Sequence, residues 1–281
     1  MIAPLPDILI LPIVRGALAE DLGRAGDATS QACVPPEARL SAVFAARKAG
    51  VVCGLACARL ALAELDPTAD FKAVLDDGSQ VGAGAKLAWV EANARALLTA
   101  ERTGLNLLGH LSGVATLTRA YVDAIEGTGA VIVDTRKTTP GLRALEKYAV
   151  RCGGGTNHRF GLDDAILIKD NHIAACGSVA EAVRRAKASA GHLMTVEVEI
   201  DGLSQLDEAL KHGPDVVMLD NFSLEDLAEA VRRAGGRAVL EASGGVTLQN
   251  VRAIAETGVD VISVGALTHS ASTLDIGLDA V

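Results

Sequence analysis

From Gly129 onward, short apolar segments alternate with amphipathic segments, and this alternation constrains the fold more strongly than any other feature of the chain. The acids Glu199, Asp220 and Glu241 stand at the ends of three apolar segments and are 21 residues apart. A constant interval of that kind is typical of a repeating strand–helix unit. Because buried parallel strands are nearly continuous apolar runs, the pattern predicts a parallel sheet covered by helices.

The repeat predicts six strands, at residues 130–135, 165–169, 195–200, 215–220, 238–242 and 261–265. Helices are expected between them, at 178–190, 203–211, 224–234 and 248–258. A complete barrel of this type has eight strands, so we expect an incomplete or atypical α/β barrel. Its chemistry should lie at the carboxyl ends of the strands, where such barrels carry their active sites.

Residues 1–110 lack this period and are expected to form a separate α/β domain. The pattern predicts strands at 38–46 and 51–54, a helix at 55–65, and a strand pair at 71–75 and 86–91. Asn93 is a typical N-cap for a helix that continues to about Leu111. Arg102 lies at the edge of the leucine stripe of that helix. It is either a structural charge or an arginine presented to a ligand or another subunit.

Cations are concentrated in one part of an acidic chain. The formal net charge is −9, yet residues 136–172 contain seven Lys and Arg against four Asp and Glu. This local excess predicts a pocket for a strongly anionic small ligand. The overall charge disfavours nucleic acid or an anionic membrane as a partner, because both require an extended basic surface.

The chain carries no sign of export or of a disulfide framework. The apolar run at residues 8–14 contains Pro12 and has no basic leading segment, so neither a signal peptide nor a membrane span is expected. The five cysteines include no Cys-x-x-Cys and are expected to stay reduced. We therefore expect a cytoplasmic protein.

Arg136 and Lys137 follow a predicted strand, and the next residues, Thr-Thr-Pro-Gly, favour a loop. Arginine presents a planar fork to a carboxylate, whereas lysine presents a point charge that suits phosphate. Farther along, the glycines at 153–155 precede His158 and Arg159, which add donors beside a permissive backbone. Together these residues suit the recognition of two different anions.

Lys169 ends a strand that is predicted to be buried, where an unpaired ammonium group is costly. It should therefore bind phosphate or lose its proton and form a Schiff base, as in an aldolase. Glu199 and Asp220 suit Mg²⁺ or sugar hydroxyls, or else cap the helices that follow. The glycine-containing segments 243–245 and 265–270 follow the last two strands, where barrels often bind phosphate.

These segments resemble the nicotinate-nucleotide pyrophosphorylases, also called quinolinate phosphoribosyltransferases. The resemblance runs from residues 20–30 through 101–113 to 265–270, and it is most specific in 134–172. It implies an N-terminal α/β sandwich domain at 1–112, joined by 271–281, and an incomplete α/β barrel at 113–270. The implied reaction converts quinolinate and phosphoribosyl pyrophosphate into nicotinate mononucleotide, pyrophosphate and carbon dioxide for NAD biosynthesis. It also implies Mg²⁺ and a homodimer or a larger homo-oligomer.

The resemblance also implies a role for each matching residue. Arg136, His158 and Arg159 would bind the two quinolinate carboxylates, with Arg102 contributed by the other subunit. Lys137 and Lys169 would serve both substrates, and Glu199 and Asp220 would face the ribose hydroxyls and the metal, so these four are expected to be catalytic. The 5′-phosphate would bind at Ser243, Gly244, Gly245, Gly265, Ala266 and His269.

The residues themselves leave three other functions open. One is a Schiff-base aldolase that uses Lys169, and another is the related molybdenum-transport-associated protein of the same superfamily. The third is an anion-binding protein without catalytic activity. The combination of Arg136, Lys137, His158 and Arg159 favours the pyrophosphorylase.

Overall fold

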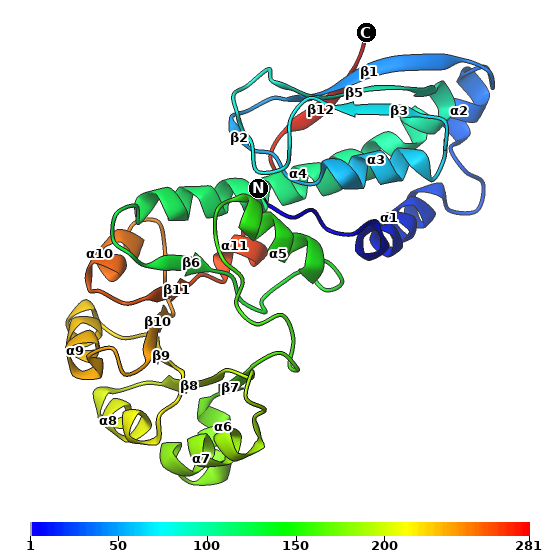
Figure 1. Cartoon of the computed structure of the whole chain (residues 1–281). Helices are drawn as coiled ribbons and strands as arrows, with labels where there is room; N and C mark the ends of the chain where they lie inside the picture. The colour runs from blue at the N-terminus through cyan, green and yellow to red at the C-terminus, as the bar shows by residue number, and fades with distance from the viewer. Residues whose placement is uncertain (1) are drawn as a thin grey trace. The chain divides into compact units, whose positions relative to one another are not determined.

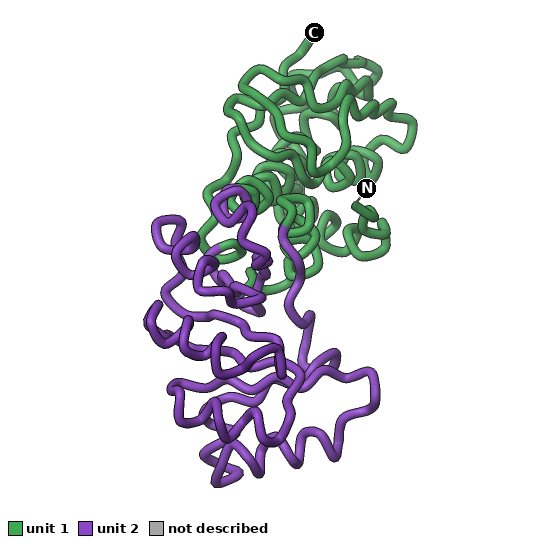
Figure 2. Tube along the Cα trace, turned by 60° about the vertical axis from the view of Figure 1, so that its left-hand side comes forward, with its two compact units in different colours: residues 1–119, 138–154, 267–281 green, residues 120–137, 155–266 purple. Residues whose placement is uncertain are grey.

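The computed structural model describes residues 2–281, and the chain forms two compact units that each combine separate stretches of sequence (Figure 2). The first unit contains the residues up to Arg119, together with Thr138–Gly154 and Leu267–Val281. The second contains Ala120–Lys137 and Gly155–Ala266. The domain boundary expected at residue 112 lies within helix α4 (Ala94–Ala124), and the limits of the two domains stay a prediction.

The first unit is built on a four-stranded antiparallel sheet in the order β12-β1-β5-β3. The strands are β1 (Arg39–Ala46), β3 (Asp70–Ala73), β5 (Lys86–Asn93) and β12 (Ile276–Ala280). Two shorter strands, β2 (Gly50–Val51) and β4 (Gln80–Val81), form a separate pair. The predicted pair at 71–75 and 86–91 is thus confirmed as β3 and β5, whereas the strand predicted at 51–54 is reduced to β2.

The helices of the first unit are α1 (Asp7–Leu22), α2 (Ala28–Cys33), α3 (Leu55–Ala63), α5 (Arg143–Cys152), most of α4 and most of α11 (Ala266–His269). The sequence pattern did not predict α1, which contains Pro12, or α5, which lies within the cationic stretch. Among the described helices, none combines the length and the apolar character needed to cross a membrane.

Helix α4 begins where the sequence predicts and continues beyond the predicted end at Leu111. Oδ1 of Asn93 accepts two backbone N–H groups of the first turn, at 3.0 and 3.2 Å, so Asn93 is confirmed as its N-cap. The later part contains Gly113, two residues beyond that predicted end. A Cβ atom at Gly113 would lie 2.1 Å from the carbonyl oxygen of Ser272, so glycine there permits close packing of two backbones.

The second unit contains a six-stranded parallel sheet in the order β6-β11-β10-β9-β8-β7. Its strands are β6 (Val131–Val133), β7 (Ile166–Ile168), β8 (Val196–Ile200), β9 (Val216–Asp220), β10 (Val239–Ser243) and β11 (Val261–Ser263). Each overlaps a predicted strand, and its ends differ from the predicted ends by at most two residues. The predicted incomplete α/β barrel is confirmed.

Helices α7 (Val179–Ser189), α8 (Leu203–His212), α9 (Leu224–Ala234) and α10 (Val251–Glu256) connect these strands. Figure 1 shows them in a row along the outer side of the strands. Ser178 and Ser223 start α7 and α9, and each hydroxyl accepts a backbone N–H from three residues farther at 3.1 Å. Helix α6 (Asp170–Cys176), which directly follows Lys169, was not predicted.

The core of the second unit is aliphatic, as the low aromatic content of 2% requires. Val198, Leu219, Leu240 and Ile262 on four neighbouring strands are almost completely buried, and Leu206 on α8 is as well. Burial of these branched side chains holds the helices against the sheet. The strand ends are thereby held on a rigid frame.

Candidate active site

The carboxyl ends of the strands in the second unit surround a cavity of about 440 Å³. Eight of the predicted site residues line it, namely Arg136, Lys137, His158, Arg159, Lys169, Glu199, Asp220 and Ser243. Thr135, Leu167, Met218, Glu241 and Ser263 complete the lining. Residues that are far apart in the sequence therefore meet at one place because the parallel strands end there.

The other predicted site residues lie on two turns of the second unit and on two helices of the first. Gly244 and Gly245 follow β10, while Gly265 and Ala266 follow β11. In the first unit, Arg102 is exposed on α4, and His269 is exposed at the end of α11.

Asp134 is a fully buried residue that fixes one loop of the cavity. It follows β6 directly, and its Oδ1 accepts the backbone N–H of His158 at 2.9 Å. Its Oδ2 accepts a hydrogen bond from the side-chain amide of Asn157 at 2.6 Å. Both contacts are charge-assisted, and they hold the loop with His158 and Arg159 beside the residues that follow β6.

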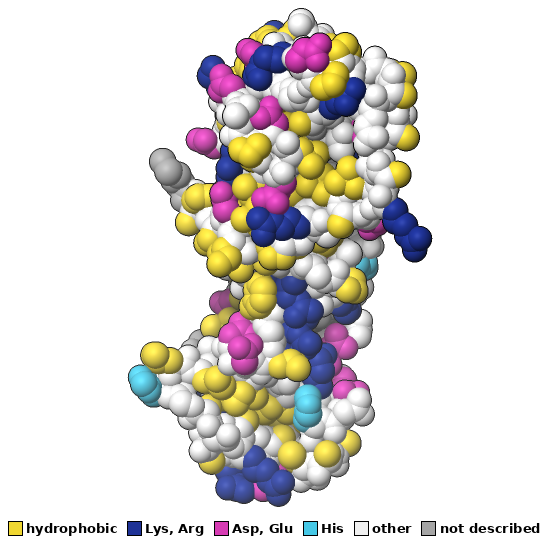
Figure 3. Space-filling model, turned by 90° about the vertical axis from the view of Figure 1, so that its right-hand side faces the viewer, with side chains coloured by type: hydrophobic (Ala, Val, Ile, Leu, Met, Phe, Trp, Pro, Cys, Tyr) yellow, Lys and Arg dark blue, Asp and Glu magenta, His cyan; other side chains and the backbone are white. Residues whose placement is uncertain are grey.

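Arg136 and Arg159 are half-buried in the cavity wall, whereas Lys137 is exposed. Burial lowers the pKa of Arg159, and the nearby charge of Arg136 lowers it further, while Glu197 acts in the opposite direction. Two neighbouring guanidinium groups are well suited to bind carboxylates. On the face drawn in Figure 3, Lys and Arg side chains gather in a band, although the chain has a net charge of −9.

Lys169 forms an ion pair at the edge of the cavity. Its Nζ lies 2.8 Å from Oε2 of Glu199, and its side chain is 47% exposed. The expectation of a buried lysine was wrong, because β7 ends at Ile168 and the next side chain is already accessible to solvent. An exposed amine beside a carboxylate lacks the desolvation that activates a Schiff-base lysine, so the aldolase interpretation loses its physical basis.

Neither Glu199 nor Asp220 caps the helix that follows it. Ser223 caps α9, and α8 begins after Gly202 without a side-chain cap. The two carboxylates instead line the cavity at the ends of the paired strands β8 and β9. Carboxylate oxygens are ligands that Mg²⁺ prefers, so this pair is suited to hold the ion.

The turn after β10 requires glycine. Gly244 has a φ of +89°, and a Cβ atom there would lie 2.2 Å from the side-chain oxygen of Asn221. Gly245 also has a positive φ, of +60°. Such a turn leaves backbone N–H groups at the end of a strand uncovered by side chains, which is a structure that suits phosphate.

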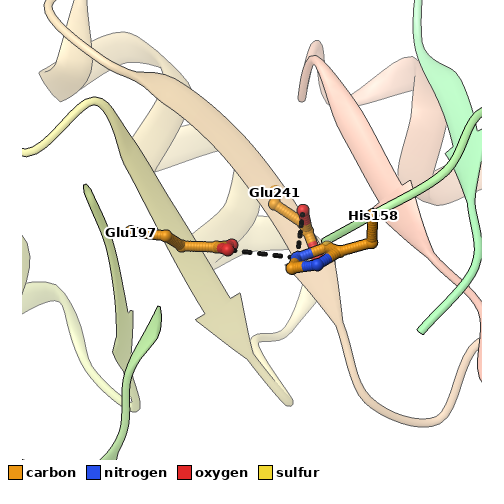
Figure 4. Close-up of side chains that lie close together, drawn as sticks. All are labelled: His158, Glu197 and Glu241. Atoms are coloured by element: carbon orange, nitrogen blue, oxygen red, sulfur yellow. Dashed lines mark ion pairs between the residues drawn. The ribbon is translucent and has the colours of Figure 1, made fainter. Parts of the chain in front are cut away.

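One cluster in the cavity wall was not predicted as a unit. Nε2 of His158 lies 3.0 Å from Oε2 of Glu197 and 3.6 Å from Oε2 of Glu241 (Figure 4). The two glutamate side chains are only 7% and 4% exposed. Burial raises the pKa of Glu241 to about 7, the charge of Glu197 raises it too, and His158 acts in the opposite direction. We call these three residues the His158 cluster.

Comparisons with known proteins agree over nearly the whole chain. The sequence profile of the quinolinate phosphoribosyl transferase N-terminal domain matches residues 27–112, and the profile of the C-terminal domain matches residues 114–279. This chain belongs to the quinolinate phosphoribosyltransferase family. The family resemblance expected from the sequence is therefore confirmed.

Relatives and solved structures of the quinolinate phosphoribosyltransferase family are similar to this chain over most or all of its length. A carboxylating nicotinate-nucleotide pyrophosphorylase of Mycobacterium leprae is 51% identical, covering 95% of each chain. A probable enzyme of the same name from Bacillus subtilis is 46% identical, covering 92% of this chain and 89% of its own length. The nicotinate-nucleotide pyrophosphorylase structure from Francisella tularensis has a TM-score of 0.95 and 42% identity, covering 100% of this chain and 99% of the other.

Sequence reasoning missed Glu197, and it named Glu241 only as one of the strand-end acids. Strand alternation offered a signal for the first, because Glu197 and Glu199 are two residues apart and share one face of β8. The 21-residue interval placed Glu241 with Asp220, but the strand register differs from that interval. Asp220 lies opposite Ser243, whereas Glu241 lies opposite Met218. Glu241 therefore sits one layer deeper than Asp220, at the level of Glu199, which also lies opposite Met218.

The contacts of Asp134 give a first test. Asp134→Asn places an amide donor against one of two existing donors, so it should lower the free energy of unfolding by about 1–3 kcal/mol. Urea unfolding measures the change. Asp201→Asn, at an exposed position after β8, is the matched control and should change stability by less than about 0.5 kcal/mol. Equal stability of the two variants would contradict the role assigned to Asp134.

Proposed function

We propose that this chain transfers the phosphoribosyl group of phosphoribosyl pyrophosphate to quinolinate with loss of carbon dioxide. The products are nicotinate mononucleotide and pyrophosphate, for NAD biosynthesis. One observation carries the proposal: a single cavity is lined by two kinds of groups. Its guanidinium groups suit a dicarboxylate, and its lysines, carboxylates and strand-end serine suit a sugar phosphate.

Arg136, His158 and Arg159 form the proposed quinolinate site. The two guanidinium groups supply planar forks for carboxylates, and their half-burial strengthens each contact relative to water. Asp134 holds the backbone of His158, so the site is positioned before the substrate binds. A contact to a charged group contributes about 1.5–3 kcal/mol, and two such contacts suit a dicarboxylate better than a monocarboxylate.

The proposed phosphoribosyl site lies at the ends of β8 to β11. The turn at Ser243, Gly244 and Gly245, with Gly265 and Ala266, would bind the 5′-phosphate through backbone N–H groups. The family resemblance also assigns His269 to this phosphate. Lys137 and Lys169 would contact both anionic substrates, namely the pyrophosphate group and quinolinate. Glu199 and Asp220 would face the ribose hydroxyls.

The proposed chemistry depends on charge placed where charge develops. Departure of pyrophosphate leaves an oxocarbenium-like ribose, and the carboxylates of Glu199 and Asp220 stabilise that positive charge. Lys137 and Lys169 stabilise the negative charge on the leaving group. The pyridine nitrogen then adds to the opposite face of the ribose. Its positive charge stabilises the electron pair that stays on C2 when the 2-carboxylate leaves as carbon dioxide. That electron pair then takes up a proton from water, which gives nicotinate mononucleotide.

We also propose Mg²⁺ as the cofactor. Glu199 and Asp220 end paired strands and line the same cavity, so their oxygens fit the donor set that the ion prefers. Bound there, directly or through water, the ion would supply positive charge to the pyrophosphate. The ion pair between Lys169 and Glu199 would have to loosen or be shared when the ion binds.

The proposed assembly is a homodimer in a cytoplasmic protein, with the partner subunit's Arg102 completing the quinolinate site. Support comes from the position of Arg102, which is exposed on α4 although that helix carries a buried leucine stripe. An exposed arginine beside such a stripe is well placed to reach across an interface. A larger homo-oligomer built from this dimer is compatible with the proposal.

Substrate choice tests the proposed function. Pyrophosphate release should be measured with Mg²⁺ and phosphoribosyl pyrophosphate, in parallel with quinolinate and with nicotinate. We expect release of pyrophosphate and carbon dioxide with quinolinate and no release with nicotinate, because the two arginines suit a ligand with two carboxylates. Release of pyrophosphate with nicotinate but not with quinolinate would reject quinolinate as the substrate. Binding of both substrates without any turnover would indicate an anion-binding protein.

Subunit mixing tests the role of Arg102. Arg102→Ala and Lys137→Ala chains should each be inactive alone, because one lacks the shared arginine and the other a lysine of the cavity. After mixing, dimers with one chain of each kind should regain part of the activity, since one of their two cavities is intact. Subunit exchange is verified with two affinity tags. Verified exchange without recovery of activity counts against the shared site.

A further inference from the structure

The His158 cluster brings one imidazole and two carboxyl groups together inside the cavity wall. Glu197 comes from β8 and Glu241 from β10, while His158 reaches between them from the loop after Thr156 (Figure 4). Their three facing atoms all lie within 4.8 Å of one another. Within the described residues, Oε1 of each glutamate is buried without a hydrogen-bond donor. The cluster thus holds two acids in a place with little solvent.

The hydrogen-bond network assigns the tautomer of His158. Its Nδ1 accepts the backbone N–H of Arg159 at 2.8 Å, so the single proton of the neutral ring lies on Nε2. That proton points to Glu197 at 3.0 Å, which is a hydrogen bond. The distance of 3.6 Å to Glu241 is too long for one. His158 therefore donates its hydrogen bond to Glu197, and it acts on Glu241 only through its charge.

Two carboxylates this close are not both stable as anions in a buried site. One of the pair takes up a proton, as in the paired carboxyl groups of aspartic proteases. Because Glu197 receives the hydrogen bond of His158, Glu241 is the group that holds the proton. The direction of its pKa agrees, since burial and then the charge of Glu197 raise it to about 7.

The groups around Glu241 have opposing effects. Glu197 on β8 and Asp134 after β6 favour the protonated form, whereas His158 and Ser263 on β11 favour the ionised form. Met218, opposite on β9, is apolar. The spacing of the cluster would also suit a metal ion. However, His158 already donates a hydrogen bond to Glu197, and the positive guanidinium group of Arg159 lies near Glu197. Both observations favour a proton in the cluster over a metal ion.

We propose that Glu241 holds an exchangeable proton in the cavity wall and that quinolinate binds tightly only while this proton is present. This inference rests on the proposed function, and it makes quinolinate binding depend on pH. Loss of the proton places a second negative charge in the wall that carries Arg136 and Arg159. That charge competes with the quinolinate carboxylates for the same cations.

The proton on Glu241 determines how the affinity for quinolinate depends on pH. Below the pKa of Glu241 the cavity is already protonated, and quinolinate binds without taking up a proton. Above it, binding must restore the proton, so quinolinate binding takes up about one proton per site. The apparent dissociation constant then rises with pH and is about tenfold weaker one pH unit above the pKa, because only the protonated fraction binds.

Calorimetry with quinolinate alone tests the inference on the full chain. Titrations at about pH 6 and about pH 8.5, each in buffers with different ionisation enthalpies, give the number of protons bound. The carboxyl groups of quinolinate are ionised throughout this range. We expect little proton uptake at the lower pH and about one proton at the higher. Binding with no proton uptake at either pH overturns the inference and leaves the proposed function intact.

Two variants identify the group that takes up the proton. Glu241→Gln keeps the size of the side chain and cannot ionise, so it should abolish the uptake and make the dissociation constant independent of pH. Asp77→Asn removes another carboxyl group whose pKa burial raises, in the first unit, and should leave the uptake unchanged. Uptake that persists in Glu241→Gln would assign the proton to a histidine and overturn the inference. Absence of any quinolinate binding by the folded wild-type chain would reject the proposed function as well.

Discussion

The parallel direction of all six strands in the second unit is the constraint on which the candidate site depends. Strands that point the same way end along one edge, so residues at or just after the ends of β6, β7, β8, β9 and β10 converge on a single cavity. The strands are short, and helices α7, α8, α9 and α10 lie along their outer side (Figure 1). Glu199 and Asp220 stand on the strands themselves, and Arg136 and Lys169 follow their strands within a few residues, so the charged residues are held on a rigid frame.

Convergence also concentrates charge, and the structure balances it locally. Asp134 anchors the loop that carries His158 and Arg159, and Glu199 pairs with Lys169. These acids reduce the repulsion among the cations while leaving the guanidinium groups of the wall available to an anion. A highly charged ligand can therefore enter a preformed site instead of ordering one. This arrangement is the physical basis for catalysis by charge placement.

Much of this architecture was predictable from the sequence, because strand–helix periodicity and strand-end residues are local signals. The six strands and four connecting helices follow from apolar runs, and Arg136, His158 and Arg159 from their motif. Contacts between distant residues carried no such signal. The exposure of Lys169 depended on where β7 ends, and the burial of Glu241 on strand register. The close approach of Ser272 to Gly113 on α4 likewise joins residues that are far apart in the sequence.

The central claim is that the guanidinium groups in the cavity wall bind a dicarboxylate. Quinolinate affinity of Arg159→Ala tests it most directly, with Arg184→Ala as a control because Arg184 is an exposed arginine paired with Glu181 on α7. The account predicts a roughly ten- to hundred-fold loss of affinity for Arg159→Ala alone, with the free energy of unfolding nearly unchanged. Wild-type affinity in Arg159→Ala would contradict it.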